Sequence, residues 1–152
     1  MRIIQKKYVF GLILLCITIV IACIIALVSK REIELRTDRE PIENRFPDLP
    51  SFTDCYWKTN IIGTKSFGPS NYWIKGFIVL DEEDAVELRE NYVWEIANIE
   101  FSKEINPEIL NINAKNWYYS DAFSKSLIRQ RFIGNFYFES EAKILYFEVE
   151  NN

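Results

Sequence analysis

The sequence contains no histidine, and this absence narrows the chemistry open to the chain. Histidine is the commonest general base and metal ligand in enzymes, and its ordinary pKa lies closest to neutral pH. Without it, Ser–His and Cys–His catalytic pairs are excluded. The 5 glycines are scattered, so the sequence has no phosphate-binding glycine loop either. We therefore expect a protein that is not an enzyme and that carries no cofactor and no metal.

Cysteine is also scarce, with 3 residues in a chain of 152. Cys16 and Cys23 lie in an apolar run, which leaves Cys55 without a disulfide partner in the rest of the chain. A chain of this length exceeds the roughly 40 residues below which domains usually need disulfides or metals. We expect the fold to depend on an apolar core, with Cys55 as a small half-buried residue of a strand.

The longest uncharged apolar run covers 21 residues, from Tyr8 to Val28. A helix of this length spans roughly 31 Å, close to the bilayer hydrocarbon thickness of about 30 Å. We therefore predict a retained transmembrane anchor with a short basic start over residues 1–29. Two alternatives remain open. Val20-Ile21-Ala22-Cys23 has the form of a lipobox, which makes Cys23 a candidate for lipidation, and a cleaved signal peptide is the other.

The basic residues around the run indicate its orientation. Arg2, Lys6 and Lys7 precede it, and a short basic start before a first span usually stays in the cytoplasm. Basic residues also follow the run, so the two flanks nearly balance. We expect a single-pass membrane protein whose C-terminal domain lies outside the cytoplasm.

A charged segment with three prolines follows the run and covers residues 30–50. Proline fixes its own φ and restricts the residue before it, which favours an extended chain. We therefore predict a juxtamembrane tether over residues 30–50 and a separate α+β domain over residues 51–152. This domain has 10 Lys and Arg against 16 Asp and Glu, a net charge of −6. Such a surface disfavours nucleic acid and favours a basic protein partner.

The hydrophobic periodicity of the domain predicts both strands and helices. Alternating β-branched and aromatic residues predict strands over residues 52–59, 72–80 and 93–101. Helical spacing follows Asp81, whose side chain we expect to accept hydrogen bonds from the first turn. A second helix is predicted after Ser120 or Asp121.

The clearest local pattern is at the carboxyl end. Residues 132–139 and 143–150 each resemble a strand, and they flank Ser140-Glu141-Ala142. They predict a β-hairpin that packs an aromatic face on the two helices. The expected fold class is therefore α+β: an N-terminal single transmembrane helix, then a small domain with a mostly antiparallel sheet, two helices and a C-terminal β-hairpin.

The 4 tryptophans leave two interpretations open. They can build a core, or they can form a binding surface, because tryptophan and tyrosine dominate interaction hot spots. Within residues 72–80, Trp73 shares a face with Lys75 rather than with the isoleucines. Trp73, Lys75 and Trp117 are therefore the candidate interaction residues.

The expected function follows from this layout, which resembles that of small bacterial envelope proteins, including membrane-tethered immunity proteins that neutralise toxins. The resemblance is one of layout and includes no motif. We expect a membrane-anchored, non-catalytic envelope protein whose domain binds another protein. Two alternatives stay open: an accessory subunit of a membrane assembly, and a saccharide- or cell-wall-handling protein that uses carboxylates.

Overall fold

The computed structural model describes residues 16–22, 33–62, 71–110, 114–129 and 131–151. The chain forms two compact units, Met1–Glu32 and Ile33–Asn152, which are treated separately. In the first unit, residues 16–22 are helical and exposed. Among the described residues, no helix combines the length and the apolar character that a membrane span requires. Most of the apolar run, and Cys23 with it, lies outside the described residues, so the transmembrane helix stays a prediction.

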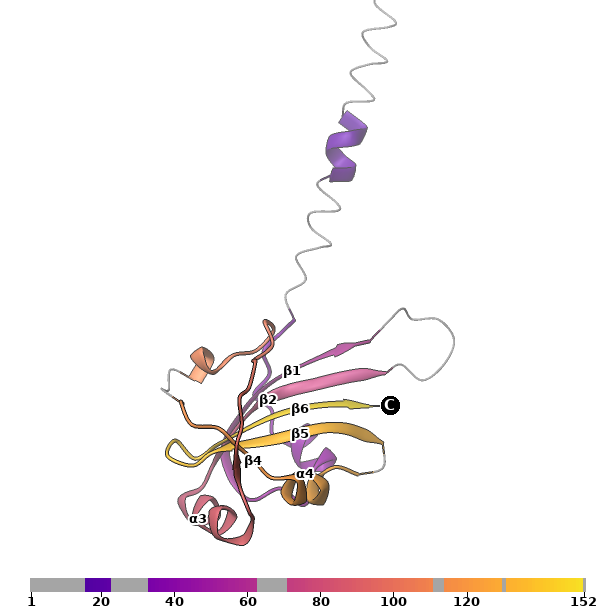
Figure 1. Cartoon of the computed structure of the whole chain (residues 1–152). Helices are drawn as coiled ribbons and strands as arrows, with labels where there is room; N and C mark the ends of the chain where they lie inside the picture. The colour runs from indigo at the N-terminus through magenta and orange to yellow at the C-terminus, as the bar shows by residue number, and fades with distance from the viewer. Residues whose placement is uncertain (1–15, 23–32, 63–70, 111–113, 130, 152) are drawn as a thin grey trace, which may run out of the picture. The chain divides into compact units, whose positions relative to one another are not determined.

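The second unit is an α+β domain built on one six-stranded antiparallel sheet, with the strand order β1-β2-β6-β5-β4-β3 (Figure 1). The strands are β1 (Phe52–Ile61), β2 (Tyr72–Leu80), β3 (Glu95–Ile96), β4 (Tyr118–Tyr119), β5 (Phe132–Glu139) and β6 (Ile144–Asn151). The helices are α2 (Glu40–Arg45), α3 (Glu82–Asn91) and α4 (Asp121–Leu127), with a 3-10 turn η1 (Pro107–Leu110). The predicted α+β class with a mostly antiparallel sheet is confirmed.

The three central strands match their sequence patterns closely. β2 covers the predicted range, and β5 and β6 form the predicted hairpin at the carboxyl end. In β6, Leu145 and Phe147 face the helices, whereas Tyr146 faces the other way, and all three are fully buried. This burial on both faces shows that β6 lies at the centre of the sheet and not at a solvated surface.

The helices cover one face of the sheet and enclose the larger core. Figure 1 shows α2 and α4 on the same side of the strands. Phe46, which directly follows α2, packs its ring 5.8 Å from Phe132, 5.3 Å from Phe136 and 5.9 Å from Phe147. Aromatic rings bury large apolar areas, so this cluster supplies the cohesion that a domain without disulfides needs.

The other face of the sheet carries a second, smaller core. Its buried members are Phe77, Ile105, Trp117, Ile144 and Tyr146. The long connection between β3 and β4, which includes η1, packs on this cluster through residues such as Ile99 and Phe101. The strand predicted over residues 93–101 is therefore largely wrong: only Glu95–Ile96 pairs, because the side chains after it are used in packing on the sheet face.

Residues 33–50 belong to the domain, where the prolines predicted an extended tether. Pro41 lies in the first turn of α2, where its missing N–H is not needed, so it helps to begin a helix. Ile42 is 0% exposed, which means that α2 is part of the core. Upstream of α2, the backbone of Arg36 exchanges hydrogen bonds of 2.8 and 2.9 Å with Trp57 of β1. The domain thus begins at Ile33, and its described residues form three α-helices where two were predicted.

The two predicted helices begin where expected, but their caps differ. Ser120 precedes α4, and its Oγ accepts a hydrogen bond of 3.4 Å from the Phe123 N–H, as predicted. Asp81 precedes α3, yet its side chain makes no capping hydrogen bond, so that expectation is wrong. The next residue, Glu82, instead forms an ion pair of 2.5 Å with Lys143, which joins the start of α3 to the β5–β6 turn.

Candidate functional site

Trp73 and Lys75, two of the sequence-predicted interaction residues, lie together on the sheet face opposite the helices. The Lys75 Nζ lies 5.5 Å from the centroid of the Trp73 ring and 3.9 Å from a Glu148 carboxylate oxygen. Trp73 pairs across the strands with Glu150, whose neighbour on β5, Ile133, is 61% exposed. Both candidates are half-buried, so this patch presents a mixed-charge, partly apolar surface.

Trp117, the third candidate, lies in the second core. Its side chain is 5% exposed. Its ring centroid lies 6.2 Å from that of Phe77, 5.4 Å from that of Phe101 and 6.3 Å from that of Tyr146. The structure therefore places Trp117 among packed aromatic rings instead of on an interaction surface. The sequence could not show this, because the rings that cover Trp117 come from other strands and from the connection before η1.

Cys55 is a buried residue of β1 and not an exposed thiol. It is 1% exposed, and its Sγ lies 3.5 Å from the carbonyl oxygen of Thr37 and 3.6 Å from that of Asp38. Burial, with a smaller contribution from the nearby Asp38 carboxylate, raises the pKa of the thiol to about 11. A protonated, enclosed thiol is a poor nucleophile, so the predicted structural role of Cys55 is favoured.

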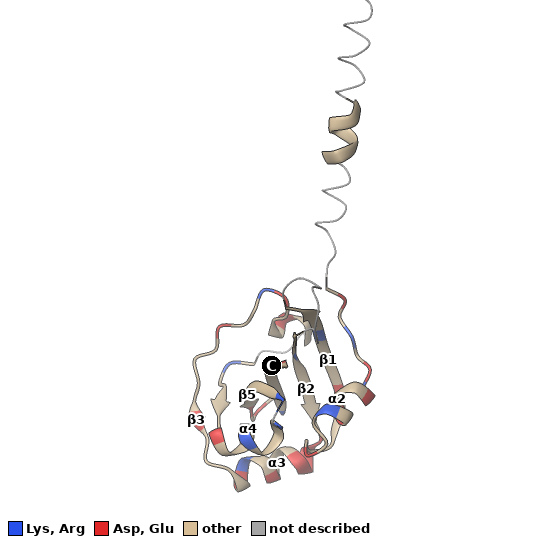
Figure 2. Ribbon diagram, turned by 90° about the vertical axis from the view of Figure 1, so that its right-hand side faces the viewer, with Lys and Arg blue, Asp and Glu red and all other residues tan. Residues whose placement is uncertain are grey.

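Several acidic residues gather where α3 and the segment after it meet the start of α4. Two hollows of about 520 and 490 Å³ adjoin there and share Asn91 and Tyr92. We call them the acidic groove. Neither hollow is lined by a Lys or Arg, and Figure 2 shows acidic residues along α3. The lining carboxylates are Asp48, Asp84 and Glu87 in the first hollow and Glu95 and Asp121 in the second.

Three of these five carboxylates have no basic partner among the described residues. Asp121 is paired with Lys125 at 2.7 Å and Asp48 with Arg129 at 3.4 Å, and all four side chains are exposed. Exposed pairs of this kind stabilise a fold little, because water screens them. Glu87 accepts a hydrogen bond of 3.2 Å from the side chain of Asn91. The groove therefore keeps a negative potential that its own basic neighbours only partly cancel.

Apolar side chains lie beside these acids. The Tyr92 ring packs 5.1 Å from Phe123 and 6.3 Å from Trp94, which fixes it between the two hollows. Val93 and Ile96 are each 83% exposed on the segment that contains β3. β3 pairs with β4 on one side, and no described strand pairs with its outer edge. Open strand edges and exposed aliphatic side chains are features that partner proteins bind.

The groove carboxylates are distributed along a surface and do not converge on one point. Nowhere in the described part of the chain do three Cys, Asp or Glu side chains come together in a group that could hold a metal ion. Distributed carboxylates on a strand edge and a helix are instead suited to several cationic side chains of a larger partner.

The sequence indicated the acidity of α3 but not the groove. Asp81 to Asp84 form a visible acidic run at the start of a predicted helix. Asp48, Glu95 and Asp121, by contrast, are separated by long stretches of sequence and meet α3 only through the fold. No protein family, curated protein or solved structure matches this chain.

Proposed function

We propose that this chain is a non-catalytic binding protein of the bacterial envelope, held at the membrane by its N-terminal apolar run. In this proposal the domain lies outside the cytoplasm and binds a basic protein partner through the acidic groove. Neutralising a toxin is one form of this function. The observation that carries the proposal is the pair of adjoining hollows, lined by five carboxylates and by no Lys or Arg.

The charge of the domain supports a basic partner. Residues 33–152 contain 13 Lys and Arg against 21 Asp and Glu, a net charge of −8. A charge of this size attracts a basic protein over distances up to the screening length, which is about 8 Å at physiological salt. Such attraction raises the association rate more than it raises the final affinity.

The side chains beside the acids support direct contact once the partner has arrived. Lys and Arg have long apolar stems that pack on aromatic and aliphatic surfaces while their charged ends stay near carboxylates. Tyr92 and Val93 offer such surfaces between Glu87 and Glu95. The open edge of β3 adds unpaired backbone groups that an extended segment of the partner can use.

The test begins with capture of partners by the detergent-solubilised full-length protein from its own cells, identified by mass spectrometry. The association rate with the captured protein is then measured at low and high salt. We expect the rate to fall as salt rises, and to fall severalfold at low salt in the double variant Glu87→Gln, Glu95→Gln. Glutamine keeps the size of the side chain and removes its charge.

A matched control removes two acids elsewhere, at Glu34, which lies upstream of α2, and at Glu108 of η1. Both are exposed, and neither lines the groove. Equal rates for the groove and control double variants, or a rate that does not change with salt, would contradict the groove assignment. A loss of affinity only in Trp73→Ala would move the interface to the open sheet face. Turnover of a wall saccharide by the purified protein would contradict the non-catalytic proposal.

A further inference from the structure

A third hollow, whose charge differs from that of the acidic groove, lies at the other end of the helix-covered face. It measures about 950 Å³, and its floor includes Tyr72, Phe132 and Asn151, which share one register row across β2, β6 and β5. Its walls come from the end of α2 and from the segment that follows α4. The strands continue past α2 and α4, and their ends, over which no described helix lies, form the floor of a cleft. The other lining residues are Asn44, Arg45, Ile128, Arg129 and Arg131.

The lining of this cleft includes three arginines and no Asp or Glu. Arg129 is paired with Asp48 at 3.4 Å. Arg131 is exposed and forms no ion pair with a described residue. Positive charge is therefore concentrated in one hollow of a domain whose net charge is −8. A concave site with an excess of one sign attracts ions of the other sign.

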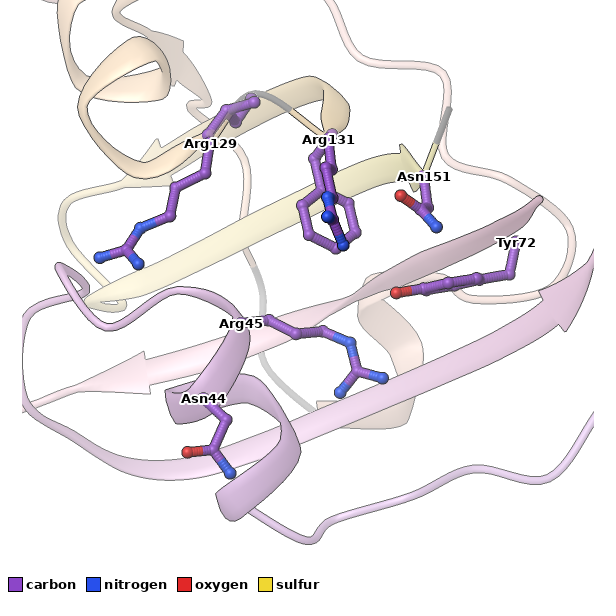
Figure 3. Close-up of a pocket in the computed structure, with 8 residues that line it drawn as sticks. Asn44, Arg45, Tyr72, Arg129, Arg131 and Asn151 are labelled. Atoms are coloured by element: carbon purple, nitrogen blue, oxygen red, sulfur yellow. The ribbon is translucent and has the colours of Figure 1, made fainter. Parts of the chain in front are cut away.

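Arg45 contributes both charge and a donor without a partner. Its Nη1 donates a hydrogen bond of 2.9 Å to the Pro41 carbonyl oxygen, and its guanidinium lies 5.8 Å from the centroid of the Tyr72 ring. Its Nε is buried and has no hydrogen-bond partner in the described structure. A buried donor without a partner is uncommon in folded proteins. Figure 3 shows Arg45 reaching toward Tyr72 while Arg129 extends away from it, and Arg131 lines the same hollow from the segment after α4.

The size and charge of the cleft limit what it can bind. Its volume lies within the range of about 300–1,000 Å³ that is usual for small-molecule sites. A long polyanion would meet the acidic surface outside the cleft, whereas a short anion would not. Guanidinium groups match the oxygen geometry of phosphate, and a phosphate monoester has a charge of about −1.5 to −2 at neutral pH. Two guanidinium groups therefore balance a phosphate better than they balance a single carboxylate.

We propose that this cleft binds a small organic phosphate. Arg45 and Arg131 hold the phosphate group, and Tyr72 and Phe132 pack against the organic part of the ligand. The proposal does not depend on the acidic groove, with which the cleft shares no lining residue.

The test titrates the full-length protein, in a non-ionic detergent at constant ionic strength, with phenyl phosphate, benzoate and inorganic phosphate. Isothermal titration calorimetry measures the affinities. We expect saturable binding of phenyl phosphate that is tighter than binding of benzoate or inorganic phosphate. Loss of a charge-assisted hydrogen bond predicts an affinity for phenyl phosphate about tenfold weaker in Arg131→Gln. Arg131 is the first choice because it is exposed and its replacement leaves the core intact.

Arg89→Gln is the matched control, since it removes the same charge from an exposed position of α3 that does not line the cleft. We expect it to bind phenyl phosphate as the unaltered protein does. Absence of saturable binding at millimolar concentration, or an equal loss in Arg89→Gln and Arg131→Gln, would overturn the proposal. Equal affinity for benzoate would overturn the assignment to phosphate. Equal affinity for inorganic phosphate and phenyl phosphate would mean that Tyr72 and Phe132 do not bind the organic part of the ligand.

Discussion

The side chain of Cys55 in β1 points into the domain, where the carbonyl oxygens of Thr37 and Asp38 lie 3.5 and 3.6 Å from its sulfur. A protonated thiol can donate to a carbonyl oxygen, whereas a thiolate cannot, so this environment favours the neutral form. Burial of the thiol, with a smaller contribution from the Asp38 carboxylate, raises its pKa from 9.0 to about 11. Because the folded pKa is the higher one, the stabilising contribution is complete below about pH 9 and is lost as the pH rises through about 11.

This environment predicts that Cys55 resists thiol reagents while the domain is folded. In the background Cys16→Ser, Cys23→Ser, we expect labelling by a chromogenic disulfide near neutral pH to be much slower in the folded protein than in denaturant, because the thiolate fraction is small and the sulfur is enclosed. The absorbance of the released thiolate measures the rate. Fast labelling of the folded protein, at the rate seen in denaturant, would mean that the sulfur is accessible.

At the scale of elements, α2 shows how tertiary contact changes the role of a short charged segment. A helix of 6 residues is far too short to be stable alone, since nucleation costs more than its few hydrogen bonds return. α2 persists because Ile42 and the adjacent Phe46 are buried against the sheet. Arg39 supports the same contact, with its guanidinium 4.4 Å from the centroid of the Phe52 ring.

The position of α2 predicts that Ile42→Ala destabilises the domain. Removal of a fully buried isoleucine side chain costs about 2–5 kcal/mol, through lost apolar burial and the cavity left behind. Leu35→Ala is the control from the same segment, because Leu35 is 40% exposed and its loss costs about 0.5 kcal/mol or less. Urea unfolding of the full-length protein, followed by tryptophan fluorescence, gives both free energies. Equal stability of the two variants would mean that residues 33–50 are a tether and not part of the domain.

At the scale of the whole molecule, the two units carry opposite charge. Residues 1–32 contain 5 Lys and Arg and 1 acid, a net charge of +4, whereas residues 33–152 carry −8. Three of the five basic residues of the first unit, Arg2, Lys6 and Lys7, precede the apolar run, and a short basic start before a first span usually stays on the cytoplasmic side of a membrane. In the proposed function, the negative charge of the domain attracts basic proteins.

The short basic start before the apolar run predicts that the carboxyl terminus lies outside the cytoplasm. One reporter that is active only outside the cytoplasm, and another that is active only inside it, are each fused after Asn152. We expect activity from the first alone. Deletion of residues 8–28 serves as the control and should reverse the pattern, because no apolar run then remains to direct insertion. Activity of the cytoplasmic reporter alone in the full-length chain would reverse the predicted orientation.

The sequence alone determined the elements whose side chains repeat with a clear period. β2, β5 and β6 follow from alternating apolar residues, and α4 follows from its spacing and from Ser120 at its start. These signals are local, because each strand or helix must bury one face wherever it lies in the fold. The antiparallel hairpin, the α+β class and the acidity of the domain could therefore be predicted from residues close together in the chain.

Only the tertiary structure decided which surfaces exist. Pro41 begins a packed helix, Trp117 lies under other rings, and Asp48 meets Glu87 across a groove, and each outcome depends on residues far away in the sequence. The arginine cleft has the same origin, since Arg45 at the end of α2 and Arg131 in the segment after α4 line the same hollow. Burial and electrostatic potential are properties of neighbours in space, so the periodicity of one segment cannot specify them.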